Sequence, residues 1–242
     1  MDKLQTYTKT YTTTTNYYDK FEDLTPMAIL DLFQNLAGRH AYLLNAGFNH
    51  MASLGAIWVI ARNEVQIRKQ VAFASDLTIK TWPLIPTRFY FDRIYELSDL
   101  SGDLCIVARS RWLLVDINNR RMLPSNVYKY PLTSFNNANY FSDDFPRLEQ
   151  VERSEQKVLS HTVRNSEIDT NGHFNNARYA ELIYNAINVE NKNSIASFLI
   201  YYLSECRLGD TIDLYVKNKD NIYQVSGYLN EIVVFNSKIV KR

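Results

Sequence analysis

The chain is poor in the residues that mark several large protein classes. Seven glycines in 242 residues are few, and no Walker or dinucleotide-binding glycine pattern is present, which argues against a nucleotide-binding loop. The two cysteines, Cys105 and Cys206, form no spaced motif, so we predict neither a disulfide framework nor a zinc site, and no cofactor. A net charge of +1 creates no overall field for nucleic acid or an anionic membrane, so an acidic partner would need a local basic patch.

Long apolar segments are also missing. No run approaches the roughly 18 apolar residues of a membrane span. Residues 1–10 are polar, lack the apolar region of a signal peptide and form no Arg/Ser-rich transit extension. We therefore expect no membrane span and a place in a bacterial-type cytoplasm. The 46% of hydrophobic residues and the 17 tyrosines predict a globular core with aromatic-rich strands.

Two helical patterns match each other at a spacing of 150 residues. The first begins at Thr25-Pro26, a capping hydroxyl with proline at the first helical position, and the second begins at Asn175-Asn176. Apolar residues recur with the period of a one-sided helix in both. The two stripes are Ile29, Leu32, Phe33, Leu36 and Ala37, and Tyr179, Leu182, Ile183, Ala186 and Ile187. The chain therefore reads as two copies of one unit.

Each predicted helix follows a short extended segment and precedes four strand-like runs. The extended segments are residues 7–18 and 157–168, and the runs are 56–68, 77–82, 88–97 and 104–115, then 195–206, 211–216, 222–228 and 232–240. This order predicts an α+β unit with an antiparallel sheet wrapped around one long helix. We place the copies at residues 1–120 and 157–242. Residues 121–156 read as a polar linker that crosses the surface.

The densest group of polar side chains lies directly before the second helix. Asp169, Asn171 and His173 alternate along an extended approach, so their side chains can share one face. The helix start offers free backbone N–H groups and a positive dipole end, which suit a carbonyl oxygen. The first copy has Phe21 and Asp23 at the positions of Asn171 and His173. Only the second copy is therefore equipped for catalysis.

A further carboxylate, Glu205, ends the apolar run 198–203. A charge buried there without a partner would cost free energy, which invites a functional explanation. Its neighbour Cys206 is a candidate nucleophile, but strand alternation favours a buried, inert thiol.

These residues also have structural interpretations. Asp169 could form an Asx-turn, and Asn175 a helix cap. Glu205 could form an ordinary ion pair with Arg207 or Arg164.

The run Asp-x-Asn-x-His-x-Asn-Asn at 169–176, with Glu205-Cys206 downstream, resembles the signature of the acyl-ACP thioesterases. Residues 57–62, 76–82, 108–116 and 119–121 resemble the family's first-unit strands and Arg-Arg turn, and the likeness covers nearly the whole chain. Phe174 departs from the valine of plant relatives. The resemblance implies a tandem double hotdog fold and hydrolysis of fatty acyl-ACP to free fatty acid and ACP, which ends fatty-acid synthesis.

The resemblance also implies roles for single residues. Glu205 would be the base that activates water, Asn171 and His173 would position water and substrate, and Asp169 would orient the loop. Related single-hotdog thioesterases place their key carboxylate near Asp169, so Asp169 as the base stays an alternative. Asn175 and Cys206 stay as additional candidates.

The sequence gives weaker evidence for the substrate carrier and for the acyl-chain pocket than for the catalytic residues. The implied partner is acyl carrier protein, and the chain allows a homodimer. The alternatives are a hotdog acyl-CoA thioesterase and a non-catalytic acyl-binding hotdog protein. The basic candidates for carrier contact are Arg109, Arg111, Arg120, Arg121 and Lys129. We expect the first copy to hold the acyl chain, with Leu32, Leu36, Ile57 and Val59 as candidate lining residues.

Overall fold

A computed structural model describes residues 4–141 and 144–242. The helices are α1 (Pro26–Leu43), α2 (Phe48–Ser53) and α3 (Asn176–Ala186), with 3₁₀ turns at Thr15–Tyr17, Ser125–Val127 and Asn165–Glu167. The strands are β1 (Tyr7–Thr12), β2 (Ala56–Ile67), β3 (Asp76–Pro83), β4 (Tyr90–Ser98), β5 (Leu104–Asp116), β6 (Met122–Leu123), β7 (Gln156–Thr162), β8 (Ile195–Tyr202), β9 (Thr211–Lys219), β10 (Ile222–Leu229) and β11 (Ile232–Lys241). No helix of the described residues is long and apolar enough to cross a membrane.

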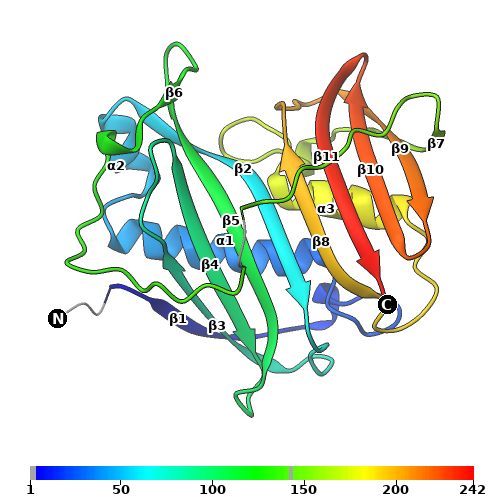
Figure 1. Ribbon diagram of the computed structural model, residues 1–242, viewed down its shortest axis with the longest axis horizontal. Helices are drawn as coiled ribbons and strands as arrows, with labels where there is room; N and C mark the ends of the chain where they lie inside the picture. Colours follow the sequence, from blue (N-terminus) through cyan, green and yellow to red (C-terminus); the bar gives the residue numbers. More distant parts are fainter. Residues whose placement is uncertain (1–3, 142–143) are drawn as a thin grey trace.

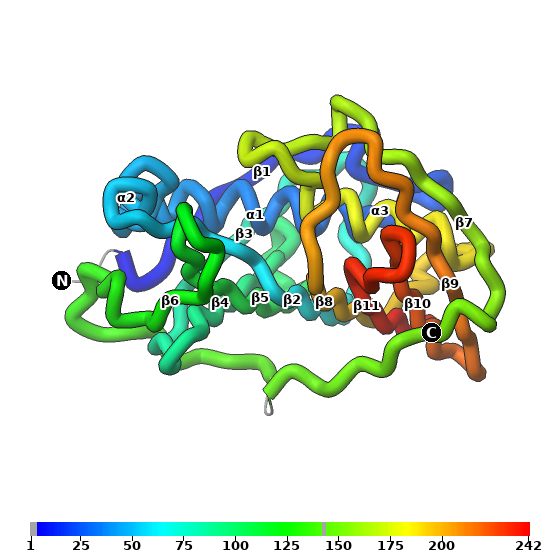
Figure 2. Tube along the Cα trace, turned by 90° about the horizontal axis from the view of Figure 1, so that it is seen from above, coloured from blue at the N-terminus to red at the C-terminus, as the bar shows by residue number. Residues whose placement is uncertain are grey.

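One antiparallel sheet runs through both copies. Its strand order is β1-β3-β4-β5-β2-β8-β11-β10-β9-β7, and β6 pairs with the end of β5. The copies meet where β2 pairs with β8, with Arg62 opposite Tyr201 and Gln66 opposite Ser197. Both long helices, α1 and α3, lie against the same face of this sheet (Figures 1 and 2). The architecture is the predicted double hotdog.

The predicted helix caps are present in both copies. The Thr25 hydroxyl accepts a hydrogen bond from the Ala28 amide, and the Asn175 side chain accepts one from the Ala177 amide. These bonds satisfy amides that have no partner within the helix. The apolar stripe of α1 is buried against the sheet, with Ile29 and Leu36 fully covered. Local capping and periodicity thus placed both helices correctly.

The offset between the copies changes along the chain. In the first copy Thr12 pairs with Asp76, and in the second Thr162 pairs with Thr211. The helix region is therefore offset by 150 residues, whereas the segment after β2 or β8 is offset by 135. The first copy is longer because α1 is longer and α2 is added. As a result, Gln70 occupies the place of Glu205.

The linker between the copies contains buried apolar and aromatic residues. Tyr130, near its start, is buried on the helix side against Phe91. The later part of the linker runs over the sheet face opposite the helices (Figure 2), and Phe141, Phe145 and Val151 are buried against that face. Apolar and aromatic residues in this aperiodic stretch cover the outer face of the sheet. The sequence indicated only a polar stretch that crosses the surface, because the buried residues are too irregularly spaced to show a pattern.

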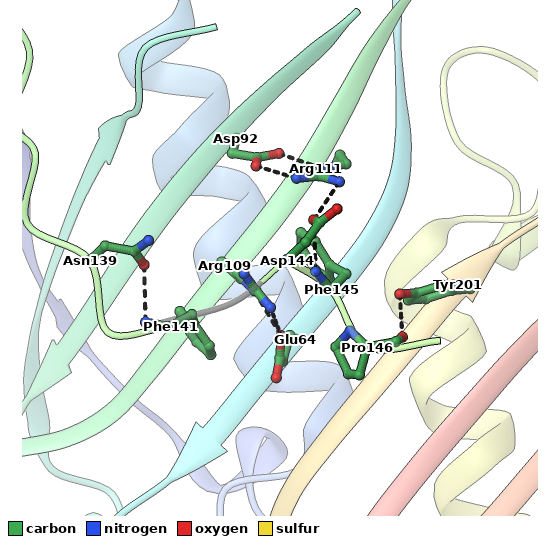
Figure 3. A network of polar contacts seen from close by, with 10 residues as sticks. All are labelled: Glu64, Asp92, Arg109, Arg111, Asn139, Phe141, Asp144, Phe145, Pro146 and Tyr201. Carbon is green, nitrogen blue, oxygen red and sulfur yellow. Dashed lines mark hydrogen bonds and ion pairs between the residues drawn. The ribbon is translucent and has the colours of Figure 1, made fainter. Parts of the chain in front are cut away.

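A cluster of arginines fastens the linker to the outer face, as Figure 3 shows. The guanidinium carbons of Arg109 and Arg111 lie 4.0 Å and 4.8 Å from the centre of the Phe145 ring. Arg109 pairs with Glu64 at 2.7 Å. Arg111 pairs with Asp92 at 2.7 Å and with Asp144 at 2.8 Å. Both arginines are 7% exposed, so they are unavailable to a docking carrier protein, contrary to our expectation.

Candidate active site

The loop before α3 is shaped by the carboxylate of Asp169. One oxygen of Asp169 accepts hydrogen bonds from the backbone amides of Asn171, at 2.8 Å, and His173, at 3.2 Å. The Asp169 amide donates to the carbonyl of His173 at 2.8 Å. Gly172, with φ of +79°, makes the left-handed turn that this closure requires. The Asx-turn interpretation of Asp169 is therefore correct as a description of the loop.

His173 and Glu205 meet across two loops. The distance from His173 Nε2 to Glu205 Oε2 is 3.0 Å, and the side chains are 19% and 37% exposed. The loops are joined by a backbone hydrogen bond of 2.8 Å from the Phe174 amide to the Cys206 carbonyl. The predicted strand run 195–206 ends at Tyr202, so Glu205 lies on a loop beyond β8. The structure thus brings together the imidazole and the carboxylate singled out in the sequence.

Glu205 has a second partner that the sequence did not suggest. Its Oε1 atom contacts Nη2 of Arg120, which lies 85 residues earlier in the chain. Among the described residues, Glu205 forms its ion pairs with Arg120 and His173 and not with the expected partners Arg207 and Arg164. Arg120 was expected to contact the carrier, and instead it lies in the candidate site. No local spacing could have revealed a contact between turns so far apart in the chain.

The remaining candidates take different positions. Among the described residues, none hydrogen-bonds the exposed Asn171 amide group, which is therefore open to a ligand. Asn175 is the helix cap, at 2.9 Å from the Ala177 amide. Cys206 is completely buried, and burial raises the pKa of its thiol, so little reactive thiolate forms. The buried-thiol interpretation fits this geometry better than the nucleophile.

A second imidazole–carboxylate pair, His161 with Glu167, lies before the loop that carries Asp169 and His173. His161 Nε2 lies 2.9 Å from Glu167 Oε2, and Glu167 also accepts from the Arg164 amide. Burial raises the pKa of Glu167, but the hydrogen bonds from the Arg164 backbone amide and from His161 together outweigh it and hold this pKa below its usual range. The Glu167 carbonyl accepts from the Asn175 amide, so this pair anchors the start of α3.

The first copy holds a degenerate counterpart of the same site. Asp19 accepts from the amides of Phe21 and Asp23 at 2.8 Å and 3.0 Å, which reproduces the Asp169 turn. Asp23 stands where the second copy has His173, and Gln70 where it has Glu205. Asp23 Oδ1 and Gln70 Oε1 are buried, without a hydrogen-bond partner among the described residues, and both side chains line one cavity. Burial raises the pKa of Asp23 above its usual range.

The site of the second copy combines three chemical functions. Glu205, partly open to solvent, can accept a proton, and His173 can share or relay it. The Asn171 side-chain amide can donate to a developing oxyanion, and the positive end of the α3 dipole favours negative charge near it. Such a set suits hydrolysis of an activated acyl compound. Among residues 4–141 and 144–242, no three His, Cys, Asp or Glu side chains are grouped as metal ligands.

Two curated plant proteins are similar to this chain. The chain is 22% identical over 198 residues to a chloroplastic acyl-[acyl-carrier-protein] hydrolase of Cuphea viscosissima, covering 76% of this chain and 48% of that protein. It is 26% identical over 207 residues to an oleoyl-acyl carrier protein thioesterase of Coriandrum sativum, covering 76% and 55%. The chain thus spans about half the length of the curated relatives it matches.

Solved structures share the fold along the whole chain. An acyl-ACP thioesterase from Bacteroides thetaiotaomicron superposes with a TM-score of 0.86 at 23% identity, covering 100% of both chains. The 12:0-ACP thioesterase from Umbellularia californica gives 0.89 at 17% identity, covering 98% of this chain and 97% of that one. The family model of the acyl-ACP thioesterase N-terminal domain matches residues 4–128, and that of the C-terminal domain matches residues 149–240. The chain therefore belongs to the acyl-ACP thioesterase family.

Proposed function

We propose that this protein hydrolyses the thioester of fatty acyl-ACP to free fatty acid and ACP, and so terminates fatty-acid synthesis. The observation that carries the proposal is the pair formed by His173 and Glu205, 3.0 Å apart, with His173 on a loop that also carries the exposed Asn171 and leads into α3. This pair lies in the C-terminal part of an acyl-ACP thioesterase, and its counterpart in the first copy lacks both groups.

The chemistry of a thioester decides which groups matter. A thiolate leaving group has a conjugate acid with a pKa of about 8.5, so it needs little help to depart. The demanding steps are to generate a nucleophile from water and to stabilise the oxyanion. In our proposal Glu205 removes the proton from water and His173 shares that proton. The Asn171 side-chain amide holds the carbonyl oxygen, near the positive end of the α3 dipole.

The choice of Glu205 over Asp169 as the base rests on their hydrogen bonds. Asp169 already accepts from two backbone amides, and a shift towards a water molecule would disturb the loop that carries His173. Among the described residues, the Glu205 carboxylate contacts the side chains of Arg120 and His173, and it is 37% exposed, so it can reach a water molecule without changing the backbone. Asp169 as the base is the alternative that the experiment below tests.

The proposed partner is acyl carrier protein, which presents the acyl chain on a phosphopantetheine arm. Arg109 and Arg111 are buried and Arg120 contacts Glu205, so Arg121 and Lys129 are the remaining exposed candidates for contact with an acidic carrier. Acyl-CoA carries the same arm, and an acyl-CoA thioesterase is therefore the nearest alternative. The name of the Cuphea relative, an acyl-carrier-protein hydrolase, favours the carrier protein.

We further propose that the first copy, residues 1–120, holds the acyl chain, while residues 157–242 carry the catalytic groups. Leu32 and Leu36 on α1 are buried on the helix side of the sheet and remain candidate lining residues. Val59 pairs with Leu113 and Ile57 with Val115, on the same face as Arg111. Ile57 and Val59 therefore face away from α1, and we withdraw them as lining residues.

The test of the active site compares two conservative substitutions. Glu205→Gln is expected to lower kcat for acyl-ACP by about 10²–10⁴-fold, because loss of a positioned base costs that much. Asp169→Asn should retain most activity, since an amide oxygen can still accept the two backbone hydrogen bonds. Glu231→Gln is a matched control, because the Glu231 side chain is 91% exposed. Full turnover by Glu205→Gln with loss in Asp169→Asn would move the base to Asp169.

A further inference from the structure

The turn between β5 and β6 is built to present one arginine. The Asp116 carboxylate accepts from the amides of Asn118 and Asn119, each at 2.9 Å, and these bonds hold the pKa of Asp116 below its usual range. The Asn119 side chain accepts from the Arg121 amide at 2.9 Å. Arg120 takes the left-handed conformation, with φ of +60°, at the tip of this turn. Glycine would adopt that conformation at lower cost, so the side chain there invites an explanation.

The side chain of Arg120 ends on the carboxylate of Glu205. Nη2 of Arg120 contacts Oε1, while His173 Nε2 lies 3.0 Å from Oε2. Each oxygen of Glu205 thus has its own partner, an arginine from the first copy on one side and a histidine from the second copy on the other. Because Glu205 lies on a loop beyond β8, no strand pairing fixes its direction.

The ion pair between Arg120 and Glu205 is better suited to orient the Glu205 carboxylate than to stabilise the fold. The side chains of Arg120 and Glu205 are 42% and 37% exposed. Ion pairs this open to water contribute little to folding, because solvent screens them and ordering long side chains costs entropy. A guanidinium nevertheless stays charged and offers donors in a fixed plane, which can hold a carboxylate in one direction. The ion pair therefore contributes more to the direction of the Glu205 carboxylate than to the free energy of folding.

We propose that Arg120 is a positioning residue that directs Glu205 towards the reaction centre, supplied by the copy without catalytic groups of its own. This inference rests on the proposed thioester hydrolysis. It makes the active site a joint product of both copies and gives the first copy a role in turnover beyond holding the acyl chain. Arg120 does not touch the substrate in this account, so its removal acts through Glu205.

The adjacent Arg121 provides a matched control. Arg121 is exposed, and its only hydrogen bonds with the described residues are made by its backbone, to Asn119 and Asp116. Arg120→Ala and Arg121→Ala therefore remove the same chemical group from neighbouring positions of one turn. Only the first substitution frees the carboxylate of Glu205.

The experiment measures kcat and KM with acyl-ACP and with acyl-CoA of the same chain length. Arg120→Ala is expected to lower kcat about 10- to 100-fold on both substrates, since small misplacement of a reacting group has effects of that order. KM should stay within about two-fold, and Arg120→Lys should restore part of kcat because it retains the charge. Thermal unfolding should be unchanged, and Arg121→Ala should turn over acyl-CoA as the wild type does.

A double-mutant cycle tests whether Arg120 acts through Glu205. Adding Arg120→Ala to Glu205→Gln should cause no further loss, because residues that act as one unit are not additive. Wild-type kcat in Arg120→Ala, an equal loss of kcat on acyl-CoA in Arg121→Ala, or a loss confined to KM for acyl-ACP would each overturn the inference. If the wild type does not hydrolyse acyl thioesters, the proposed function fails. If the wild type is active and Glu205→Gln is impaired, those three outcomes overturn the inference alone.

Discussion

Replacing Asp23 by asparagine is expected to stabilise the protein at neutral pH. Asp23 is 5% exposed, and one carboxylate oxygen accepts from the Asn193 amide. The other oxygen and Gln70 Oε1 are buried without partners, and both side chains line the same cavity. An asparagine oxygen can keep the bond from Asn193, while its NH₂ group brings donors into this cavity. The substitution thus removes an orphaned acceptor and can supply Gln70 with a hydrogen bond.

The size of the effect follows from the orphaned acceptors. A buried polar group without a partner costs about 1–3 kcal/mol, so relieving one or both should contribute about 1–2 kcal/mol. For a chain of this length that corresponds to a rise in Tm of roughly 2–8 °C. Thermal unfolding followed by circular dichroism measures it. Asp19→Asn should instead lower Tm, because the Asp19 carboxylate has partners on both oxygens, including the Tyr184 hydroxyl at 2.5 Å.

The pH dependence gives an independent check of this reasoning. Burial raises the pKa of Asp23, with the Asp19 carboxylate acting in the same direction. The folded protein therefore binds this proton more tightly than the unfolded chain, and stability is lost as pH rises through the folded pKa. Protonated Asp23 can itself donate a hydrogen bond, so the advantage of asparagine should shrink as the pH falls through the raised pKa of Asp23. A Tm for Asp23→Asn that is unchanged or lowered at about pH 7.5 would refute the argument.

The other predictions concern the site and its specificity. Cys206→Ala should retain most turnover, because the thiol is fully buried and its pKa is raised, and a loss of hydrolysis in a folded variant would contradict the inert-thiol interpretation. Charge reversal at Arg121 and Lys129 should raise KM for acyl-ACP at low salt, because these exposed charges would no longer attract an acidic carrier, and KM for acyl-CoA should change little. Equal effects on both substrates would argue against carrier contact at these residues. Leu36→Trp should shift the released acids towards shorter chains, because a larger side chain shortens the pocket and each methylene that is no longer buried loses about 0.8 kcal/mol. An equal shift from Leu182→Trp would place the pocket in the second copy.

Features that depend on neighbouring residues were predictable from the sequence. The helix caps at Thr25 and Asn175 are local hydrogen bonds, and the apolar stripes follow helical periodicity. The polar group before α3 is also local, and the loop brings His173 to Glu205. The duplication was visible because the cap position and the apolar stripe recur at the same spacing of 150 residues in both copies.

Features that depend on distant pairing were not predictable. Arg120 meets Glu205 because β5, β2 and β8 are adjacent in the sheet, and no spacing in the sequence encodes that order. The match of Gln70 with Glu205 was hidden because the offset between copies changes from 150 to 135. The burial of Arg109 and Arg111 depends on Phe145, a linker residue without a periodic pattern.

The central claim is that the protein releases fatty acids from acyl carrier protein by hydrolysing the thioester. The most direct measurement is kcat/KM of the wild type for one acyl chain carried by ACP and by CoA, at low and at physiological salt. Our account predicts hydrolysis of both, with a higher kcat/KM for acyl-ACP that falls more steeply with salt, because an acidic carrier is attracted by exposed charge. Failure to hydrolyse acyl-ACP, or a higher and salt-independent kcat/KM for acyl-CoA, would contradict it.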